Sequence, residues 1–397
     1  MRLLIVSHTP HYVRDGAIVG WGPTVREIDY LARMFDEVIH VAFLHQVPPP
    51  ESALAYRSPN VRVLGVTPSG GPRIKDKIGI LFRSFEYLRT IRRHLGRSYM
   101  VHVRCPASIS LMALALLSLK REPSHRWVKY AGNWWPEGRE PWSYRFQRWW
   151  LNRNIHRGVV TVNGRWPDQP RHIFSFLNPC LTSEEIRTVY RVARNKKLTE
   201  PLRLIFVGHL SKSKGVLQTL AIVEKLIAQK FNITLDIVGD GPMAEILKRK
   251  IEEKKLENAV VLHGWRQRTE LGQYYSRAHF LLFPSKSEGW PKVISEAMAY
   301  GVVPLAGAVS SIPQILGEIG TGRFIHPDNI DEYVQTILFY LDHPEVWEKE
   351  RDAGLKAAPL FTYEAYLDAV RSMFKQAWNL DLTEDSKAVI QRTASSA

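Results

Sequence analysis

The chain has 397 residues, 45% of them hydrophobic, and this length predicts two domains rather than one. The two cysteines, Cys105 and Cys180, are too few for a disulfide framework or a cysteine-based zinc site. No apolar run reaches the length of about 18 residues that a membrane-spanning helix needs, and the short apolar start is typical of a first strand rather than a signal peptide.

The positive charge is confined to the first half of the chain. Residues 1–200 contain 31 Lys/Arg and 15 Asp/Glu, a net +16, whereas residues 201–397 contain 23 and 24, a net −1. A basic half attracts anionic partners such as membrane lipids, phosphorylated acceptors or nucleic acid. The alternative is a solvated basic surface without a partner.

Short apolar, β-rich runs alternate with helical patterns through the first half. The strands are predicted at residues 3–7, 38–44, 61–66, 100–103, 127–130 and 159–162. The helices are predicted at residues 24–34, 78–95, 108–120 and 143–155. This alternation predicts a parallel sheet with helices on both faces.

A second series begins after the polar stretch at residues 191–200. Its strands are predicted at residues 202–207, 234–238, 260–262, 280–283 and 302–305. Its helices are predicted at residues 214–228, 243–255, 269–277 and 291–300, followed by 328–341, 345–357 and 363–378. Both halves are therefore predicted to be doubly wound α/β domains, and ligands bind such sheets beyond the carboxyl ends of the strands.

We expect the chain to divide into four parts. Residues 1–195 and 196–360 would form the two domains, and a helix within residues 361–380 would pack back toward the first domain. The polar tail at residues 381–397 is expected to be disordered.

The most informative motif spans residues 283–301, FPSKSEGWPKVISEAMAYG. A strand meets a polar turn with Gly289 and Pro291, and the following helix start offers free N–H groups to an anion or a hydroxyl. Glu288 lies in the turn, and Glu296 lies about 10 Å further along the chain path. This spacing suits two hydroxyl-bearing groups, such as a sugar and a ribose, better than one metal ion. Alternatively, Glu288 stabilises only the helix N-terminus and Glu296 is solvated.

This stretch resembles the E-x7-E motif of glycosyltransferase family 4, including the S-E-G-W-P core and the E-A-M-A-x-G continuation. The resemblance implies a GT-B fold, in which two Rossmann-like domains face each other across a cleft, and retaining transfer from a nucleotide sugar. Residues 207–215, VGHLSKSKG, resemble the family's V-G-R-L-x(3)-K-G segment, which holds the donor diphosphate. Lys214 matches the family's lysine, whereas His209 replaces its arginine and carries less charge at pH 7.

Other segments resemble the family's nucleotide site. Residues 237–242, IVGDGP, resemble a turn where glycine lets the backbone approach the nucleotide, and residues 260–265 resemble the strand that ends at the base. Arg266 joins Trp265 as a candidate for base contacts, whereas a lone His263 is more typical of a structural histidine. The resemblance implies donor-binding roles for Gly20, Gly22, Gly208, Gly239, Gly241, Trp265, Gly289, Trp290, Pro291, Val293 and Glu296. For Gly20 and Gly22, an ordinary strand–helix turn is the alternative.

Acceptor-side candidates come from strand ends in the first half. Residues 101–106, VHVRCP, resemble the strand end where many family members carry a functional histidine. Register places Arg104 there, but alternation turns His102 to the same face, so the assignment stays open. The next strand end adds Lys129, Asn133 and Glu137.

Two basic stretches carry further interpretations. Residues 73–97 predict an amphipathic helix with eight Arg/Lys, and residues 127–166 hold seven of the 12 tryptophans, interleaved with arginines. Tryptophan with arginine suits a membrane interface or a lipid-linked acceptor, and aromatic rings also stack on sugars. The alternative is a Trp-rich core under solvated arginines.

The sequence thus predicts a metal-independent glycosyltransferase that uses a nucleoside diphosphate sugar and no cofactor. The catalytic candidates are Lys214, assisted by His209, for the leaving diphosphate, and Glu288 for the donor sugar. Glu296 would bind the ribose. We expect a glycan or lipid-linked acceptor, a cytoplasmic location at the inner face of an anionic membrane, and no nucleic acid.

Two alternatives stay open. A sugar-nucleotide epimerase could use the same fold. A nucleotide-binding scaffold without catalysis would be compatible with the departures at His209 and Arg104.

Overall fold

The computed structural model describes residues 1–69, 74–136, 138 and 140–382, with the backbone only for residues 74–82. The chain forms two compact units. Unit 1 comprises Met1–Phe176 together with the chain from Tyr366 onward, and unit 2 comprises Leu177–Ala365. The candidate Glu137 and the tail from residue 383 lie outside the described residues.

Unit 1 is built on a nine-stranded sheet whose parallel strands run in the order β5-β3-β1-β6-β7-β8-β9. Strand β1 continues well beyond residue 7, because a register shift between Val6 and Pro10 lets its second half pair antiparallel with β2. Strand β4 then extends β2. The strands are β1 (Arg2–Arg14), β2 (Ala17–Trp21), β3 (Glu37–Leu44), β4 (Ala53–Ala55), β5 (Val61–Val66), β6 (Met100–Cys105), β7 (His125–Tyr130), β8 (Val159–Asn163) and β9 (Ile173–Phe176).

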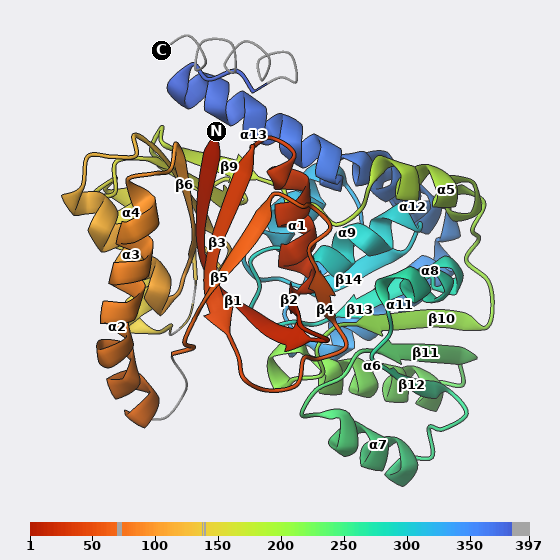
Figure 1. Ribbon diagram of the computed structural model, residues 1–397. Coiled ribbons are helices and arrows are strands. Elements are labelled where there is room, and N and C mark those ends of the chain that lie inside the picture. Colours follow the sequence, from red (N-terminus) through yellow and green to blue (C-terminus); the bar gives the residue numbers. More distant parts are fainter. Residues whose placement is uncertain (70–73, 137, 139, 383–397) are drawn as a thin grey trace. The chain divides into compact units, whose positions relative to one another are not determined.

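Alternate residues of β1 enter two different cores, as the period of two in a strand requires. Leu4 and Val6 pack with α2, α3 and α4, whereas Leu3 and Ile5 pack with α1 and α13. Figure 1 shows α2, α3 and α4 on one side of the unit 1 sheet and α1 on the other. These helices are α1 (Gly22–Ala32), α2 (Ile74–Leu95), α3 (Ser108–Leu119), α4 (Trp142–Asn152) and α13 (Tyr363–Trp378).

Unit 2 is a six-stranded parallel sheet in the order β12-β11-β10-β13-β14-β15. Its short apolar strands are mostly buried on both faces, as expected for a parallel sheet between helices. The strand order reverses between β10 and β13, which makes their carboxyl ends the switch point where ligands bind in such sheets. The strands are β10 (Leu202–Val207), β11 (Ile233–Val238), β12 (Val260–Gly264), β13 (Phe280–Phe283), β14 (Val303–Gly307) and β15 (Arg323–Ile325).

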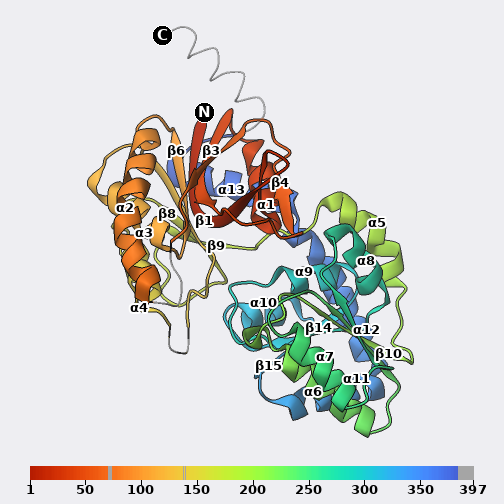
Figure 2. The same cartoon turned by 60° about the horizontal axis from the view of Figure 1, so that its bottom comes forward.

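Helices and short 3-10 turns connect these strands, as Figure 2 shows from a second side. They are α5 (Ser183–Arg194), η1 (Lys212–Lys214), α6 (Val216–Ala228), α7 (Ala244–Glu253), α8 (Arg268–Arg277), α9 (Lys292–Ala299), α10 (Ile312–Ile319), α11 (Ile330–Asp342), α12 (Pro344–Ala357) and η2 (Ala358–Phe361). In the described part of the chain, no helix is both long and apolar enough to cross a bilayer.

Candidate active site

The carboxyl ends of β10, β11 and β12 are tied together by their backbones. Gly208 donates its N–H to the carbonyl oxygen of Val238 at 3.0 Å, and Gly239 donates to the carbonyl oxygen of Gly264 at 2.9 Å. Three turns thus form one continuous edge, at the end of the sheet where parallel strands present ligand-binding loops.

Two glycines permit this edge to close. A Cβ on Gly239 would lie 1.9 Å from the carbonyl oxygen of Gly208, and a Cβ on Gly215 would lie 2.0 Å from that of Pro284. Both residues have positive φ, 143° and 77°. Only glycine adopts this conformation at such short backbone distances without strain. Gly215 also separates η1 from α6, so Lys214 ends a 3-10 turn rather than opening the predicted helix.

The central interaction of this edge is an ion pair between Lys214, which follows β10, and Glu288, which follows β13. Ser285 donates its hydroxyl to the same Oε1 of Glu288 at 2.7 Å. The N–H of Lys286 donates to the carbonyl oxygen of Ser213 at 2.8 Å, which holds the two loops side by side. The switch point of unit 2 therefore carries one ammonium and one carboxylate in fixed orientation.

Glu296 has a different set of partners. The hydroxyl of Tyr275 donates to its Oε2 at 3.2 Å, and the Nε of Arg268 lies 3.9 Å from its Oε1. Burial and the nearby Glu296 raise the pKa of Tyr275 far above its usual value, so Tyr275 stays a hydrogen-bond donor. Arg268 is itself bonded to Glu185 and to the carbonyl oxygen of Cys180. Glu288 and Glu296 are therefore oriented by different sets of partners.

Among the other donor-side candidates, some side chains are accessible to a ligand and others are buried in the core. His209 is exposed, and its ring borders Gly241, where an added Cβ would lie 2.8 Å from the His209 Cε1. Trp265 is half-buried in the loop after β12. Trp290, by contrast, is buried, stacks on Phe361 at 5.4 Å and donates Nε1–H to Ser295 at 2.8 Å. Its indole is part of the core.

The segment around Trp290 is also committed to packing. Gly289 accepts a hydrogen bond from the Ser311 hydroxyl at 2.8 Å through its carbonyl oxygen. Pro291 is buried directly before α9, and Val293 packs at the border of the unit 2 core. These residues shape the turn that carries Glu288.

Sequence reasoning missed several polar groups of unit 2. Ser285 and Tyr275, which orient the two glutamates, belong to no charged pattern that would single them out. Asp236 could have been found from the sequence, because it is a charged residue inside an apolar strand. It receives two bonds from Arg277, at 2.9 and 2.6 Å, and lies 2.6 Å from the Nε2 of His263. His263 thus has a structural partner.

In unit 1, Arg104 and Lys129 are brought together on one buried carboxylate. Each donates to Oε1 of Glu27 at 2.7 Å, and the hydroxyl of Tyr366 lies 3.2 Å from the same atom. The three charged residues are at most 9% exposed. Removing Glu27 would take away the carboxylate that both buried cations share.

The remaining unit 1 candidates have local packing partners. His102 is fully buried, its ring lies 3.8 Å from that of Trp127, and neither ring nitrogen has a hydrogen-bond partner among the described residues. Burial, reinforced by Arg104, lowers the pKa of His102 far below its usual value. Asn133 accepts the N–H of Trp135 at 3.0 Å.

Gly20 and Gly22 are positioned by close packing inside unit 1. A Cβ on Gly20 would lie 2.6 Å from the ring of His11. A Cβ on Gly22 would lie 2.9 Å from the carbonyl oxygen of Ser52. Gly20 belongs to β2 and Gly22 begins α1, so the predicted strand–helix turn is very short.

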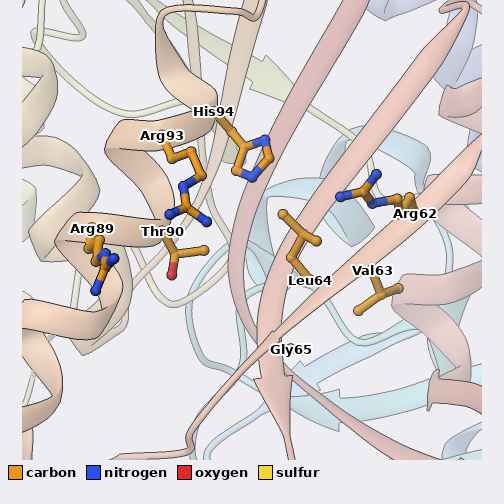
Figure 3. Close-up of a pocket in the computed structure, with 8 residues that line it drawn as sticks. All are labelled: Arg62, Val63, Leu64, Gly65, Arg89, Thr90, Arg93 and His94. Carbon is orange, nitrogen blue, oxygen red and sulfur yellow. The ribbon is translucent and has the colours of Figure 1, made fainter.

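A basic pocket of about 410 Å³ lies between β5 and α2 (Figure 3). Figure 3 shows Arg89, Arg93 and His94 on the helix and Arg62 on the strand. Burial and the surrounding arginines lower the pKa of His94. Part of the excess positive charge of the first half is therefore concentrated here.

Residues 191–358 match the model of the family described as glycosyl transferases group 1. This segment is therefore similar to group 1 glycosyl transferases. The match covers most of unit 2 and includes Lys214, Glu288 and Glu296. The resemblance to glycosyltransferases that the sequence indicated is thereby shown, while family 4 in particular stays a prediction.

Curated glycosyltransferases are similar to part of this chain. The amylovoran biosynthesis glycosyltransferase AmsK of Erwinia amylovora is 29% identical over 154 residues, which cover 37% of this chain and 38% of AmsK. The chain spans about half the length, or less, of the curated relatives it matches.

Two solved structures are similar over almost the whole chain. Sucrose-phosphate synthase from Thermosynechococcus elongatus has a TM-score of 0.69 at 16% identity, covering 94% of this chain and 98% of that one. Anabaena HepE, solved in complex with UDP and glucose, has a TM-score of 0.65 at 14% identity, with 94% and 99% covered. These likenesses confirm the predicted fold class, two Rossmann-like α/β domains of the GT-B type.

Proposed function

We propose that the protein transfers a sugar from a nucleoside diphosphate sugar to a hydroxyl group of an acceptor, with the donor bound at the carboxyl ends of β10 and β13. The observation that carries this proposal is the pairing of Lys214 with Glu288 where the strand order reverses. An ammonium beside a carboxylate matches the two parts of such a donor, an anionic diphosphate and a polyhydroxylated sugar.

In the proposed step, the bond between the anomeric carbon and the β-phosphate oxygen breaks, and the acceptor oxygen bonds to that carbon. The nucleoside diphosphate leaves with the electron pair of the broken bond, and its departing β-phosphate oxygen accepts the proton of the acceptor hydroxyl. Negative charge therefore grows on the diphosphate, and a fixed ammonium at Lys214 stabilises the transition state more than the bound donor. The family resemblance adds the expectation that the anomeric configuration is retained.

Lys214 and Glu288 would exchange partners when the donor binds. The side chain of Lys214 is 28% exposed and that of Glu288 is 9% exposed, so the lysine is the more accessible member of the pair. The diphosphate would take over the ammonium, and Glu288 would accept hydrogen bonds from sugar hydroxyls. Ser285 would keep Glu288 oriented during this exchange.

The neighbouring groups complete the proposed donor site. Glu296, held by Tyr275, would accept the hydroxyls of the ribose. Exposed His209 would donate to the diphosphate, and Trp265 would contact the base. We further propose that no metal ion is required, because Lys214 supplies the positive charge. Turnover that persists in excess EDTA is the expected result.

The names of similar proteins suggest which substrates to try first. HepE was solved with UDP and glucose, and AmsK is named for amylovoran biosynthesis. We therefore propose UDP-sugars as the first donors to test and growing polysaccharides or lipid-linked glycans as acceptors. Contact of the basic unit 1 with an anionic membrane stays a prediction.

The test is release of nucleoside diphosphate from a panel of nucleotide sugars in the presence of these acceptors. Lys214→Met should lower kcat by about 100-fold or more, a typical loss for one group that stabilises the transition state. Lys212→Met is the matched control, since Lys212 is an exposed lysine on the same turn. Full turnover by Lys214→Met would contradict the proposal, and epimer formation without acceptor would favour an epimerase.

A further inference from the structure

Unit 1 contains a large pocket, about 1180 Å³, that the proposed donor site does not use. The loops after β7 and β8 and the helix α4 line it, so it lies toward the carboxyl ends of those strands. Its lining includes Trp134, Trp135, Trp149, Arg145, Asn152 and Asp168. Ligands bind open parallel sheets at this end.

Two tryptophans offer the pocket aromatic surface that the protein core does not cover. Trp135 is 53% exposed and Trp149 is 46% exposed. Trp135 lies nearly parallel to Trp166, with ring centroids 6.1 Å apart and an interplanar angle of 7°. Trp149 packs beside Phe146, and the guanidinium of Arg153 lies 5.4 Å from its ring centroid. Both indoles are thus held as fixed platforms.

The pocket also contains polar groups that are available to a ligand. Within the described part of the chain, the side chains of Arg145, Asn152 and Asp168 make no hydrogen bond or ion pair. Arg148, in contrast, is paired with Glu140 and donates to Tyr130 at 3.3 Å, so it belongs to the wall. A guanidinium, an amide and a carboxylate together can serve both the donors and the acceptors of sugar hydroxyls.

This combination identifies the class of ligand. The C–H groups on one face of a pyranose carry partial positive charge and match the negative face of an indole, while its hydroxyls require polar partners at the ring edge. A bilayer would instead favour a protruding apolar surface without a carboxylate. The protruding aromatic residue here is Trp142, which is 73% exposed and does not line the pocket.

We infer that this pocket is a saccharide-binding site, and that it holds a sugar unit of the glycan acceptor. The assignment of the bound sugar to an acceptor rests on the proposed function, since only a transferase has an acceptor. The saccharide-binding property itself depends on unit 1 alone. Trp135 and Trp149 stack on the sugar, and Arg145, Asn152 and Asp168 bond its hydroxyls.

The experiment is binding of the full chain to an array of bacterial polysaccharide fragments, followed by titration of the best glycan by tryptophan fluorescence. Wild type binds at least one glycan saturably. Trp135→Ala weakens that affinity by about tenfold or more, as expected for loss of an aromatic contact. Trp142→Ala, on the same helix as Trp149 but outside the pocket, is the matched control and keeps wild-type affinity.

A second variant tests whether a loss of binding reflects unfolding. Asp168 has φ of 52°, a conformation that asparagine tolerates, so Asp168→Asn keeps the backbone while removing the charge. It should also weaken glycan binding while the thermal midpoint stays unchanged. Equal loss in Trp142→Ala, or no glycan binding by wild type on the array, overturns the inference.

The two proposals fail in distinguishable ways. Nucleoside diphosphate binding, measured separately by thermal shift, reports on unit 2, and Trp135→Ala should leave it unchanged. Glycan binding without nucleotide binding would contradict only the proposed donor site. If the protein instead bound phosphatidylglycerol vesicles in a Trp135-dependent manner and bound no glycan, the pocket would be a membrane surface rather than a saccharide site.

Discussion

Gly239 lies where the turns after β10 and β11 meet, and its contact with the Gly208 carbonyl oxygen explains why a side chain cannot be accommodated. Gly239→Ala should destabilise unit 2 by about 3 kcal/mol or more, because positive-φ strain and steric overlap add. Gly320→Ala is the control: Gly320 also has positive φ, 74°, but no atom lies within 4 Å of the added Cβ. It should cost roughly 1–2 kcal/mol. Chemical denaturation measures both, and equal losses would refute the steric argument.

Buried neutral histidines should make the protein sensitive to acid. Burial, reinforced by His172 and Arg126, lowers the pKa of His156 from 6.5 to about 3. Burial likewise lowers the pKa of His11 and of His279 to about 4. Above pH 6.5 these groups are neutral in both states, and as the pH falls below 6.5 the unfolded state binds protons first. The free energy of unfolding should therefore fall between pH 6.5 and about 3.

Each such histidine contributes a slope of at most about 1.4 kcal/mol per pH unit. His156→Phe should flatten the acid limb by this amount. Urea denaturation at a series of pH values measures the slope. An unchanged slope in His156→Phe would mean that His156 is not held neutral.

The sequence motifs pointed to individual candidate residues but not to the side chains that pack against them. Lys214 and Glu288 could be expected at one sheet edge, because each follows a strand in a recognisable motif. Their direct contact depends on strand order, which the chain does not state. The buried indole of Trp290 depends on Phe361, 71 positions later, and no local pattern connects the two.

The C-terminal helix α13 shows how elements distant in the chain complete unit 1. Its buried side chains Tyr366, Val370 and Phe374 share a core with Leu3 and Ile5 of β1. Phe374→Ala should cost about 3–5 kcal/mol, because a fully buried aromatic side chain leaves a cavity. Lys375→Ala, exposed on the same helix, should change stability little. Denaturation curves compare the two, and similar values would contradict the docking of this helix.

Element boundaries were predicted well where the apolar period was clear and less well elsewhere. Helix α5 was missed, although Thr182 and Glu185 form a complete capping box at its start. Strand β2 was missed because it pairs with an extension of β1 beyond a register shift. Such long-range pairing leaves no periodic signal of its own.

At the scale of the whole molecule, the candidate donor site and the described pockets lie in different units. Unit 2 contains the matched glycosyl transferase segment and the Lys214–Glu288 pair. Unit 1 contains both described pockets. A donor site in one unit and acceptor recognition in the other would let the two evolve separately, and this is consistent with a family match confined to unit 2.

Calorimetric titration with UDP, GDP, ADP, CDP and TDP tests the central claim most directly. Wild type should bind at least one of these nucleotides, Lys214→Met should weaken that affinity by about tenfold or more, and Lys212→Met should not. If none of the nucleotides binds wild type, or if Lys214→Met binds as tightly as wild type, the diphosphate is not held at the switch point of unit 2.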